Sequence, residues 1–237
     1  AGDGASDSLG ALIDNVIVTG INQPELVTRE DEPITIPFAE LLANDTDIDG
    51  DALSIVVGSI TSEVNGTLSV DYVNETITFT PDQDYNGEAT FQYTVTDGNG
   101  GEDQATVTLN ITPVNDAPEL NIDTGEVGED ATLTVGAGNG LLSNDSDVDG
   151  DSLNVTGILN GTTGTATAVA ESGDTVISND YGTLTIRADG SYSFVADGSD
   201  SQALATGAIA DVVFTYTASD GTVNQTNTLT ITVTGTN

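Results

Sequence analysis

The 237-residue sequence contains no cysteine, histidine, methionine or tryptophan, and its positively charged side chains are limited to Arg29 and Arg187. Without cysteine, the fold has neither disulfides nor thiolate metal sites. Histidine, cysteine and lysine are the usual bases and nucleophiles of enzymes, so we expect no catalytic activity. No apolar run approaches the roughly 18 residues of a transmembrane helix, so we expect no membrane insertion.

Acidic residues dominate the charge, with 39 Asp and Glu against 2 basic residues and a formal net charge of −37. Such a surface repels nucleic acids and anionic membranes, which we exclude as partners. Like charges also oppose compaction, and cations that bind the native chain would add to its stability. The alternative is an acidic disordered chain or a halophile-type surface.

Short alternating segments indicate strands rather than helices. Aromatic residues make up 5% of the chain, and Val, Ile, Leu and Thr supply most of its apolar and β-branched character, which suits strands. In "ATFQYTVTDG" (89–98), Phe91, Tyr93 and Val95 alternate with polar residues before an Asp-Gly turn. This period of two predicts a half-buried strand and argues against disorder.

A boundary phrase occurs three times, in "VTGINQPEL", "ITPVNDAPEL" and the terminal "TVTGTN", and aligns at Asn22, Asn115 and Asn237. The intervals of 93 and 122 residues suit β-sandwich domains. We therefore predict an all-β chain of two tandem immunoglobulin/cadherin-like Greek-key sandwiches, residues 22–114 and 115–237. Residues 1–21 would be a leader or the last strand of a preceding repeat. Because the chain starts without methionine or a signal pattern, we expect it to be a piece of a longer protein.

Two acidic loops lie one hundred positions apart, "NDTDIDGD" (44–51) and "NDSDVDGD" (144–151). Both satisfy the D-x-[DN]-x-[DN]-G start of an EF-hand calcium loop, but the twelfth position is Val56 or Thr156 instead of glutamate. Clustered carboxylates without His or Cys favour Ca²⁺ over Mg²⁺ and over soft metals. The alternative is a solvated turn, since Asp, Asn and Gly also dominate ordinary loops.

Several sequence motifs, taken together, resemble those of a known family. The stretch "ELLANDTDIDGDALSI…ITFTPDQDYNGEATFQYTVTDGNGG…ITPVNDAP" resembles the cadherin-like repeats of very large bacterial surface adhesins. The stretch "YGTLTIRADGSYSFVADGSDSQALATG…FTYTASDGT…LTITVTGTN" is similar to the VCBS repeat of the same proteins. The resemblance spans about residues 16–237. It implies calcium-stiffened sandwiches in the extender arm of a secreted, RTX-type adhesin at the bacterial cell surface.

The resemblance also implies a ligand set, carried over by position. Sandwich topology places the B–C and F–G loops beside the incoming linker and the A–B and E–F loops at the opposite end, so neighbouring repeats would share ions. The set for the domain junction is Glu30, Asp31, Asp82, Asp84, Asn115, Asp116, Asp147, Asp149, Asp151 and Asp220. Asp145 opens the second loop. The first loop, Asp45, Asp47, Asp49 and Asp51 with Asp97, would face an upstream repeat, and Glu129 and Asp130 would face a downstream one.

We therefore predict calcium-dependent stalk repeats, monomeric as a fragment, whose partners are neighbouring repeats of the same chain. Carbohydrate binding is the alternative, because Tyr72, Tyr85, Tyr181 and Tyr192 could stack on sugars of a polysaccharide or another cell surface. Paired carboxylates are also the catalytic groups of glycoside hydrolases, but these acids are crowded in loops instead of facing each other across a cleft.

Overall fold

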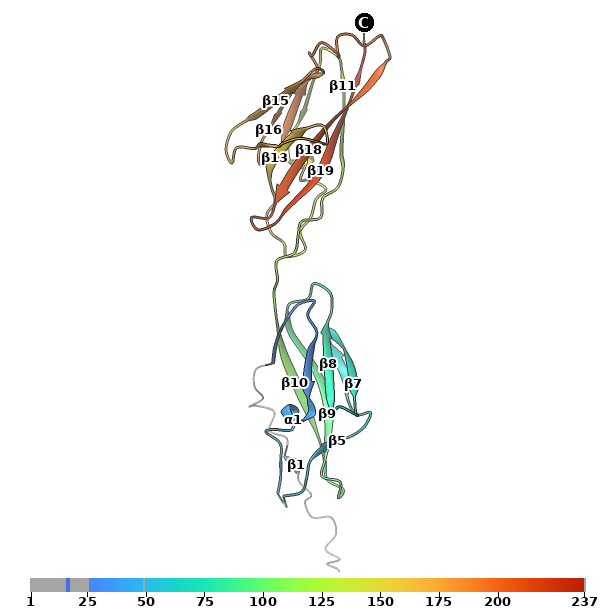
Figure 1. The fold of residues 1–237 in the computed structure, drawn as a ribbon, viewed down its shortest axis with the longest axis vertical. Coiled ribbons are helices and arrows are strands. Elements are labelled where there is room, and N and C mark those ends of the chain that lie inside the picture. Colours follow the sequence, from blue (N-terminus) through green and yellow to red (C-terminus); the bar gives the residue numbers. More distant parts are fainter. Residues whose placement is uncertain (1–15, 18–25, 49, 237) are drawn as a thin grey trace, which may run out of the picture. The chain divides into compact units, whose positions relative to one another are not determined.

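A computed structural model of the protein describes residues 16–17, 26–48 and 50–236. It divides into two compact units, and the division falls between Val114 and Asn115. Strands dominate both units (Figure 1). Within the described part of the chain, no helix is long and apolar enough to span a membrane.

Unit 1 is a two-sheet sandwich with one short helix, α1 (Phe38–Leu41). Its strands are β1 (Val16–Ile17), β2 (Leu26–Arg29), β3 (Ile34–Pro37), β4 (Thr46–Asp47), β5 (Ser54–Ile55), β6 (Thr61–Val64), β7 (Gly66–Asp71), β8 (Thr76–Pro81), β9 (Gly87–Thr96) and β10 (Glu102–Thr112). One sheet has the order β2-β10-β9-β5, with β6 also paired to β9, and the other has the order β3-β8-β7. A short β1-β4 pair stands apart from both.

Unit 2 is also a two-sheet sandwich, and it has a 3₁₀ turn, η1 (Ala137–Asn139), in place of the short helix. Its strands are β11 (Asp123–Gly128), β12 (Thr132–Val135), β13 (Asn154–Asn160), β14 (Thr167–Ala168), β15 (Thr175–Asn179), β16 (Gly182–Ile186), β17 (Tyr192–Val195), β18 (Ile209–Ser219) and β19 (Asn224–Thr234). The five-stranded sheet has the order β11-β19-β18-β13-β14, and the four-stranded sheet has the order β12-β17-β16-β15.

Each unit buries its own core between its two sheets. In unit 1, Phe91, Tyr93 and Val95 on β9 are each 0% exposed, which confirms the alternation predicted from the sequence. They pack with Phe79 of the facing sheet. In unit 2, β18 contributes the equivalent row Phe214, Tyr216 and Ala218. Burying apolar area of this kind is the main stabilising contribution to a sandwich.

The first strand of each main sheet pairs in parallel with the last strand of its unit, β2 with β10 and β11 with β19. Neighbouring strands elsewhere in the sheets run antiparallel within the described chain. Because parallel strands end at the same edge of a sheet, the turn after β2 lies beside the end of β10. The turn after β11 lies beside the end of β19 for the same reason.

Candidate metal centre

Parallel pairing places a glutamate against the outgoing chain of unit 1. The Glu30 amide donates a hydrogen bond of 3.0 Å to the Thr112 carbonyl, continuing the β2-β10 ladder by one residue. The Glu30 side chain, 2% exposed, accepts a very short hydrogen bond from the Val114 amide through Oε1. Its other oxygen, Oε2, lies 3.5 Å from Nδ2 of Asn86. Glu30 therefore fixes the last residues of unit 1 before the linker.

Unit 2 repeats this arrangement with Glu129. Its amide donates to the Thr234 carbonyl at 2.9 Å, and its Oε1 accepts from the Thr236 amide at 2.6 Å and from the Thr236 hydroxyl at 3.0 Å. Glu129 is 3% exposed. The aspartates that follow the two glutamates, Asp31 and Asp130, have φ values of 60° and 63°. The residue pair therefore makes the same left-handed turn in both units.

Asp31 and Asp84 meet at the same end of unit 1. The Asp84 amide donates to Oδ1 of Asp31 at 3.3 Å, although the two residues are 53 positions apart. Asp84 lies in the turn between β8 and β9, where Asp82 donates its amide to the Asn65 carbonyl at 3.1 Å. The turn after β2 and the turn after β8 thus bring predicted ligands of unit 1 to one edge.

The second acidic loop gathers three carboxylates within unit 2. Asp147, Asp149 and Asp151 each offer an oxygen, and these oxygens lie within 4.8 Å of one another. Oδ1 of Asp147 accepts the Asp149 amide at 3.1 Å and the Asp151 amide at 3.3 Å. Gly150 takes φ 79°, which lets the chain turn tightly. The loop folds back over the Asp147 side chain.

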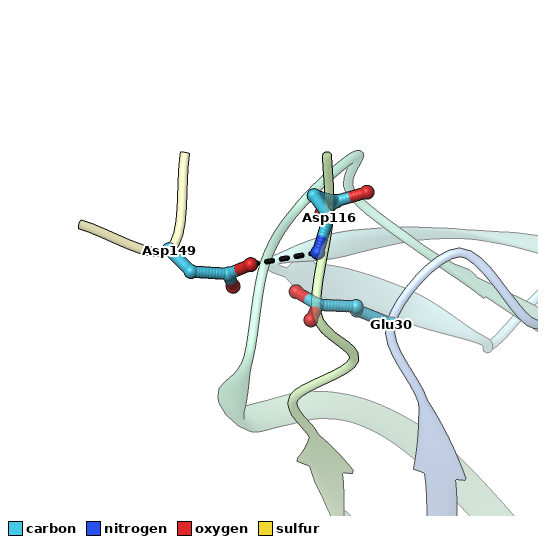
Figure 2. Close-up of side chains that lie close together, drawn as sticks. All are labelled: Glu30, Asp116 and Asp149. Atoms are coloured by element: carbon cyan, nitrogen blue, oxygen red, sulfur yellow. Dashed lines mark hydrogen bonds between the residues drawn. The ribbon is translucent and has the colours of Figure 1, made fainter. Parts of the chain in front are cut away.

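The start of unit 2 is hydrogen-bonded to the same loop. The Asp116 amide donates to Oδ2 of Asp149 at 2.7 Å (Figure 2). Asn115 donates from Nδ2 to Oδ2 of Asp220 at 2.9 Å. That hydrogen bond, followed by those from the backbone amides of Val223 and Thr222, lowers the pKa of Asp220. Figure 2 also draws Glu30, which belongs to unit 1.

The first acidic loop has the same internal hydrogen bond as the second. The Asp51 amide donates to Oδ1 of Asp47 at 3.0 Å, and Asn99 donates to Oδ2 of Asp51 at 2.7 Å. Asp97, 6% exposed, accepts the amides of residues 99–101 through Oδ1. The structure therefore brings Asp47, Asp51 and the Asp97 turn together in unit 1. Asp49 lies outside the described residues.

The first aspartate of each loop points to a core tyrosine. Oδ2 of Asp45 lies 3.2 Å from the Tyr93 hydroxyl, and Oδ2 of Asp145 lies 3.2 Å from the Tyr216 hydroxyl. Burial raises the pKa of both carboxyl groups. It also raises the pKa of both tyrosines.

Sequence reasoning missed one acid beside this pair in unit 2. Burial raises the pKa of Asp123 to about 6, while a hydrogen bond from Tyr216 lowers it and the charge of Asp145 raises it. Asp123 is isolated in the sequence and is the first residue of a strand, so no motif identifies it. The repeated tyrosine, in "FQYTV" and "FTYTA", was the available signal for the Tyr93 and Tyr216 positions.

The Asp147 group fits a hard cation. Its Oδ2 is buried and has no hydrogen-bond partner among the described residues, while Oδ1 is occupied by two amides. Two carboxylates 4 Å apart repel each other by about 1 kcal/mol in water and by more at lower dielectric. A Ca²⁺ ion takes six to eight oxygen ligands and would replace that repulsion with attraction. Carboxylate oxygens, without nitrogen or sulfur, suit this ion.

Two family models match the chain in tandem. A model described as a cadherin-like domain matches residues 18–112. A model described as a bacterial cadherin-like domain matches residues 115–235. Among curated proteins the chain has no match.

Solved structures give weaker likenesses. Human mucin-like protocadherin EC1-2 is 16% identical with a TM-score of 0.48, over 90% of this chain and 96% of that one. Human CDH23 EC21-23 is 12% identical with a TM-score of 0.49, over 90% and 67%. An endo-fucoidan hydrolase of glycoside hydrolase family 107 is 20% identical with a TM-score of 0.30, over 90% of this chain, which spans 27% of its length.

Proposed function

The chain belongs to the bacterial cadherin-like domain family, and on that premise we propose that its two repeats are calcium-dependent extender modules of a bacterial surface adhesin. Cadherin-like domains are usually extracellular adhesion or extender modules, and they typically bind calcium. The proposal adds that this chain uses calcium at its acidic loops and at the linker to stiffen an array of repeats. Its partners would be the neighbouring repeats of the same chain.

The Asp147 carboxylate is the observation that carries the proposal. One oxygen is held by two backbone amides, and the other lies buried beside Asp149 and Asp151, where no described residue hydrogen-bonds to it. A buried, charged oxygen left without a partner is costly, so such groups are normally paired or bound to a metal. A calcium ion would supply the missing partner.

The proposal also covers the linker between the two units, which contains Asn115 and Asp116. Glu30 binds the amide of Val114, and the next two residues, Asn115 and Asp116, bind Asp220 and Asp149. One acid of unit 1 and two acids of unit 2 therefore bind three consecutive residues of the chain. We propose that calcium bound by these acids restrains the linker, which becomes a hinge without it. The RTX-type adhesin context and the VCBS character of the second repeat belong to this proposal.

Calorimetry of the full chain tests the proposal. We expect isothermal titration of metal-stripped protein to show heat on addition of calcium, and the melting temperature to rise by several degrees. A site at free calcium of about 100 times Kd adds about 2.7 kcal/mol of stability. Asp147→Asn should weaken the affinity of the unit 2 site about tenfold or more. Glu126→Gln removes the same charge from an exposed position on β11 and should change little.

Small-angle scattering tests the linker separately. In calcium the maximum dimension should be larger and the distance distribution narrower than in chelator. Absence of both heat and melting shift would falsify calcium binding. Identical scattering profiles, with calcium binding intact, would refute the stiffening of the linker alone.

A further inference from the structure

The outer face of the four-stranded sheet in unit 2 is lined with hydroxyl groups. Alternation along each strand turns one set of side chains to the core and the other outward. Register pairs Thr134 of β12 with Ser193 of β17, and Ser193 with Thr185 of β16. These three residues are the outward set, since their neighbours on β16 and β17 are buried in the core. A row of three hydroxyls thus crosses the sheet.

A groove lies where this row meets the end of the sheet. Its volume is about 240 Å³, and its lining includes Thr134, Ser193 and Thr185 together with Gly136, Arg187 and Asp174. Gly136 has open space where a side chain would begin, so the groove stays accessible on the β12 side. Tyr192, 6% exposed, contributes to the lining from the core side. The space is smaller than the roughly 300–1,000 Å³ of sites for drug-sized ligands, which suits one sugar ring.

An arginine–aspartate pair closes this end of the groove. Nε of Arg187 donates to Oδ1 of Asp174 at 2.5 Å, and the two side chains are 58% and 47% exposed. The pairing uses Nε and Oδ1, which leaves the terminal nitrogens of the guanidinium and the second carboxylate oxygen for a ligand. Donors and acceptors therefore stand side by side. Vicinal hydroxyls of a sugar need both, because each hydroxyl donates one hydrogen bond and accepts others.

Local charge selects against an anionic ligand. Arg187 is the one basic residue between 115 and 237, and it faces two carboxylates, Asp174 by direct contact and Asp189 at longer range. Asp189 itself accepts the amide and the hydroxyl of Ser191, a further lining residue. The groove is thus net negative within a chain of charge −37. A polyanion would be repelled, whereas a neutral polyol would not.

We propose that this groove binds a neutral saccharide, with Arg187 and Asp174 holding vicinal hydroxyls and the Thr134, Ser193 and Thr185 hydroxyls contacting the remainder of the ring. This function goes beyond calcium-dependent extension. None of the lining residues belongs to the predicted calcium ligands, so the two activities occupy separate places in unit 2. An extender repeat with such a groove would itself attach to a glycan surface.

Pull-down with insoluble polysaccharides tests the proposal on the full chain in calcium. The probes are three neutral polymers, cellulose, chitin and cross-linked dextran, and one polyanion, alginate. We expect retention on at least one neutral polymer and none on alginate. Arg187→Ala should weaken binding at least about tenfold, the equivalent of about 1.4 kcal/mol. Arg29→Ala makes the same charge change in unit 1 and should leave binding unchanged.

A second pair of variants separates a hydroxyl contact from a change in folding. Thr185→Val removes one lining hydroxyl at nearly constant shape, and Thr132→Val makes the same change at an exposed position of β12 in the same sheet, two residues before Thr134 and outside the lining. We expect weaker binding for the first and wild-type binding for the second, with equal melting temperatures. Retention on alginate, failure on all three neutral polymers, or equal binding by Arg187→Ala would each overturn the proposal.

Discussion

The Tyr93 hydroxyl lies 3.2 Å from Oδ2 of Asp45, a residue 48 positions earlier in the chain. Tyr216 and Asp145 repeat this contact at the same distance in unit 2. Each tyrosine has one hydroxyl proton and more than one acceptor: Tyr93 also reaches the Leu41 carbonyl at 2.9 Å, and Tyr216 reaches the Asn121 carbonyl at 3.0 Å and the Asp123 carboxyl group. The first aspartate of each acidic loop is thereby attached to the core of its unit.

Replacing either tyrosine by phenylalanine should lower stability modestly. The ring and its packing remain, but one hydrogen bond is lost and the carboxylate and carbonyl lose a donor. We expect Tyr216→Phe to reduce the free energy of unfolding by about 1–2 kcal/mol. Denaturant titration in calcium measures it. Val73→Phe, at a site 90% exposed, should have no comparable effect. An unchanged midpoint for Tyr216→Phe would contradict the anchoring role.

Asp123 should make unit 2 less stable as pH rises. Its folded pKa of about 6 exceeds the unfolded value of about 3.9, so the folded state holds the proton more tightly. The free energy of unfolding therefore falls as pH rises from about 4 to about 6, and the cost is fully present above that range. In calcium-free buffer, Asp123→Asn should raise the melting temperature near neutral pH. The increase should be much smaller at about pH 4.

Asp71 supplies a control of opposite sign for this experiment. Hydrogen bonds from the backbone and side chain of Asn74 lower the pKa of Asp71. Its contribution to stability is therefore present above the unfolded pKa and disappears as pH falls through the lower folded value. Asp71→Asn should reduce the melting temperature near neutral pH and not in strong acid. Equal pH dependence of the two variants would contradict both assignments.

Two equivalent glycines should tolerate no side chain. A Cβ on Gly66 would lie 2.2 Å from Cζ of Phe79, and one on Gly182 would lie 2.0 Å from the Val195 carbonyl oxygen and 2.9 Å from Cζ of Phe194. Gly182→Ala should cost about 1–3 kcal/mol, because overpacking moves backbone or core. Gly138→Ala meets nothing within 4 Å and should be neutral. Melting curves that coincide for the two variants would refute the steric account.

Salt should partly replace calcium in stabilising the chain. Screening shortens the range of repulsion among acids, from about 10 Å at 0.1 M ionic strength to about 3 Å at 1 M. In chelator, the melting temperature should therefore rise with NaCl concentration. The increment produced by calcium should shrink over the same series. A melting temperature independent of NaCl would show that repulsion among the acids contributes little to the free energy of unfolding.

Strand pattern and loop chemistry could be predicted from the sequence because they depend on neighbouring residues. Alternation located the buried face of β9, confirmed at Phe91 and Tyr93. The two acidic loops can be recognised from the sequence. Backbone amides of these loops bind aspartate side chains of the same loop, as the Asp51 amide binds Oδ1 of Asp47. The similar phrases "GTLSV" and "GTLTI" form equivalent strands, β7 and β16, but the phrases do not reveal how close the glycines lie to phenylalanine.

Contacts set by strand register and by parallel pairing could not be predicted in this way. Asp123 carries no motif, and only the fold buries it beside Tyr216. Arg187 and Asp174 meet because the β15-β16 hairpin places them across from each other just beyond Thr175 and Ile186. A shift of one residue in that register would turn one of these two side chains to the other face of the sheet and separate the pair.

The sequence by itself determined that this chain is all-β, repeats its plan twice and concentrates its charge in loops, because periodicity and composition are local properties. The tertiary structure decided which acids share a centre and which serve the core. Glu30 reaches Val114 only because β2 runs parallel to the strand that ends its unit. Pairing between strands far apart in the chain is settled by the packing of the whole sandwich, and no short stretch of residues contains it.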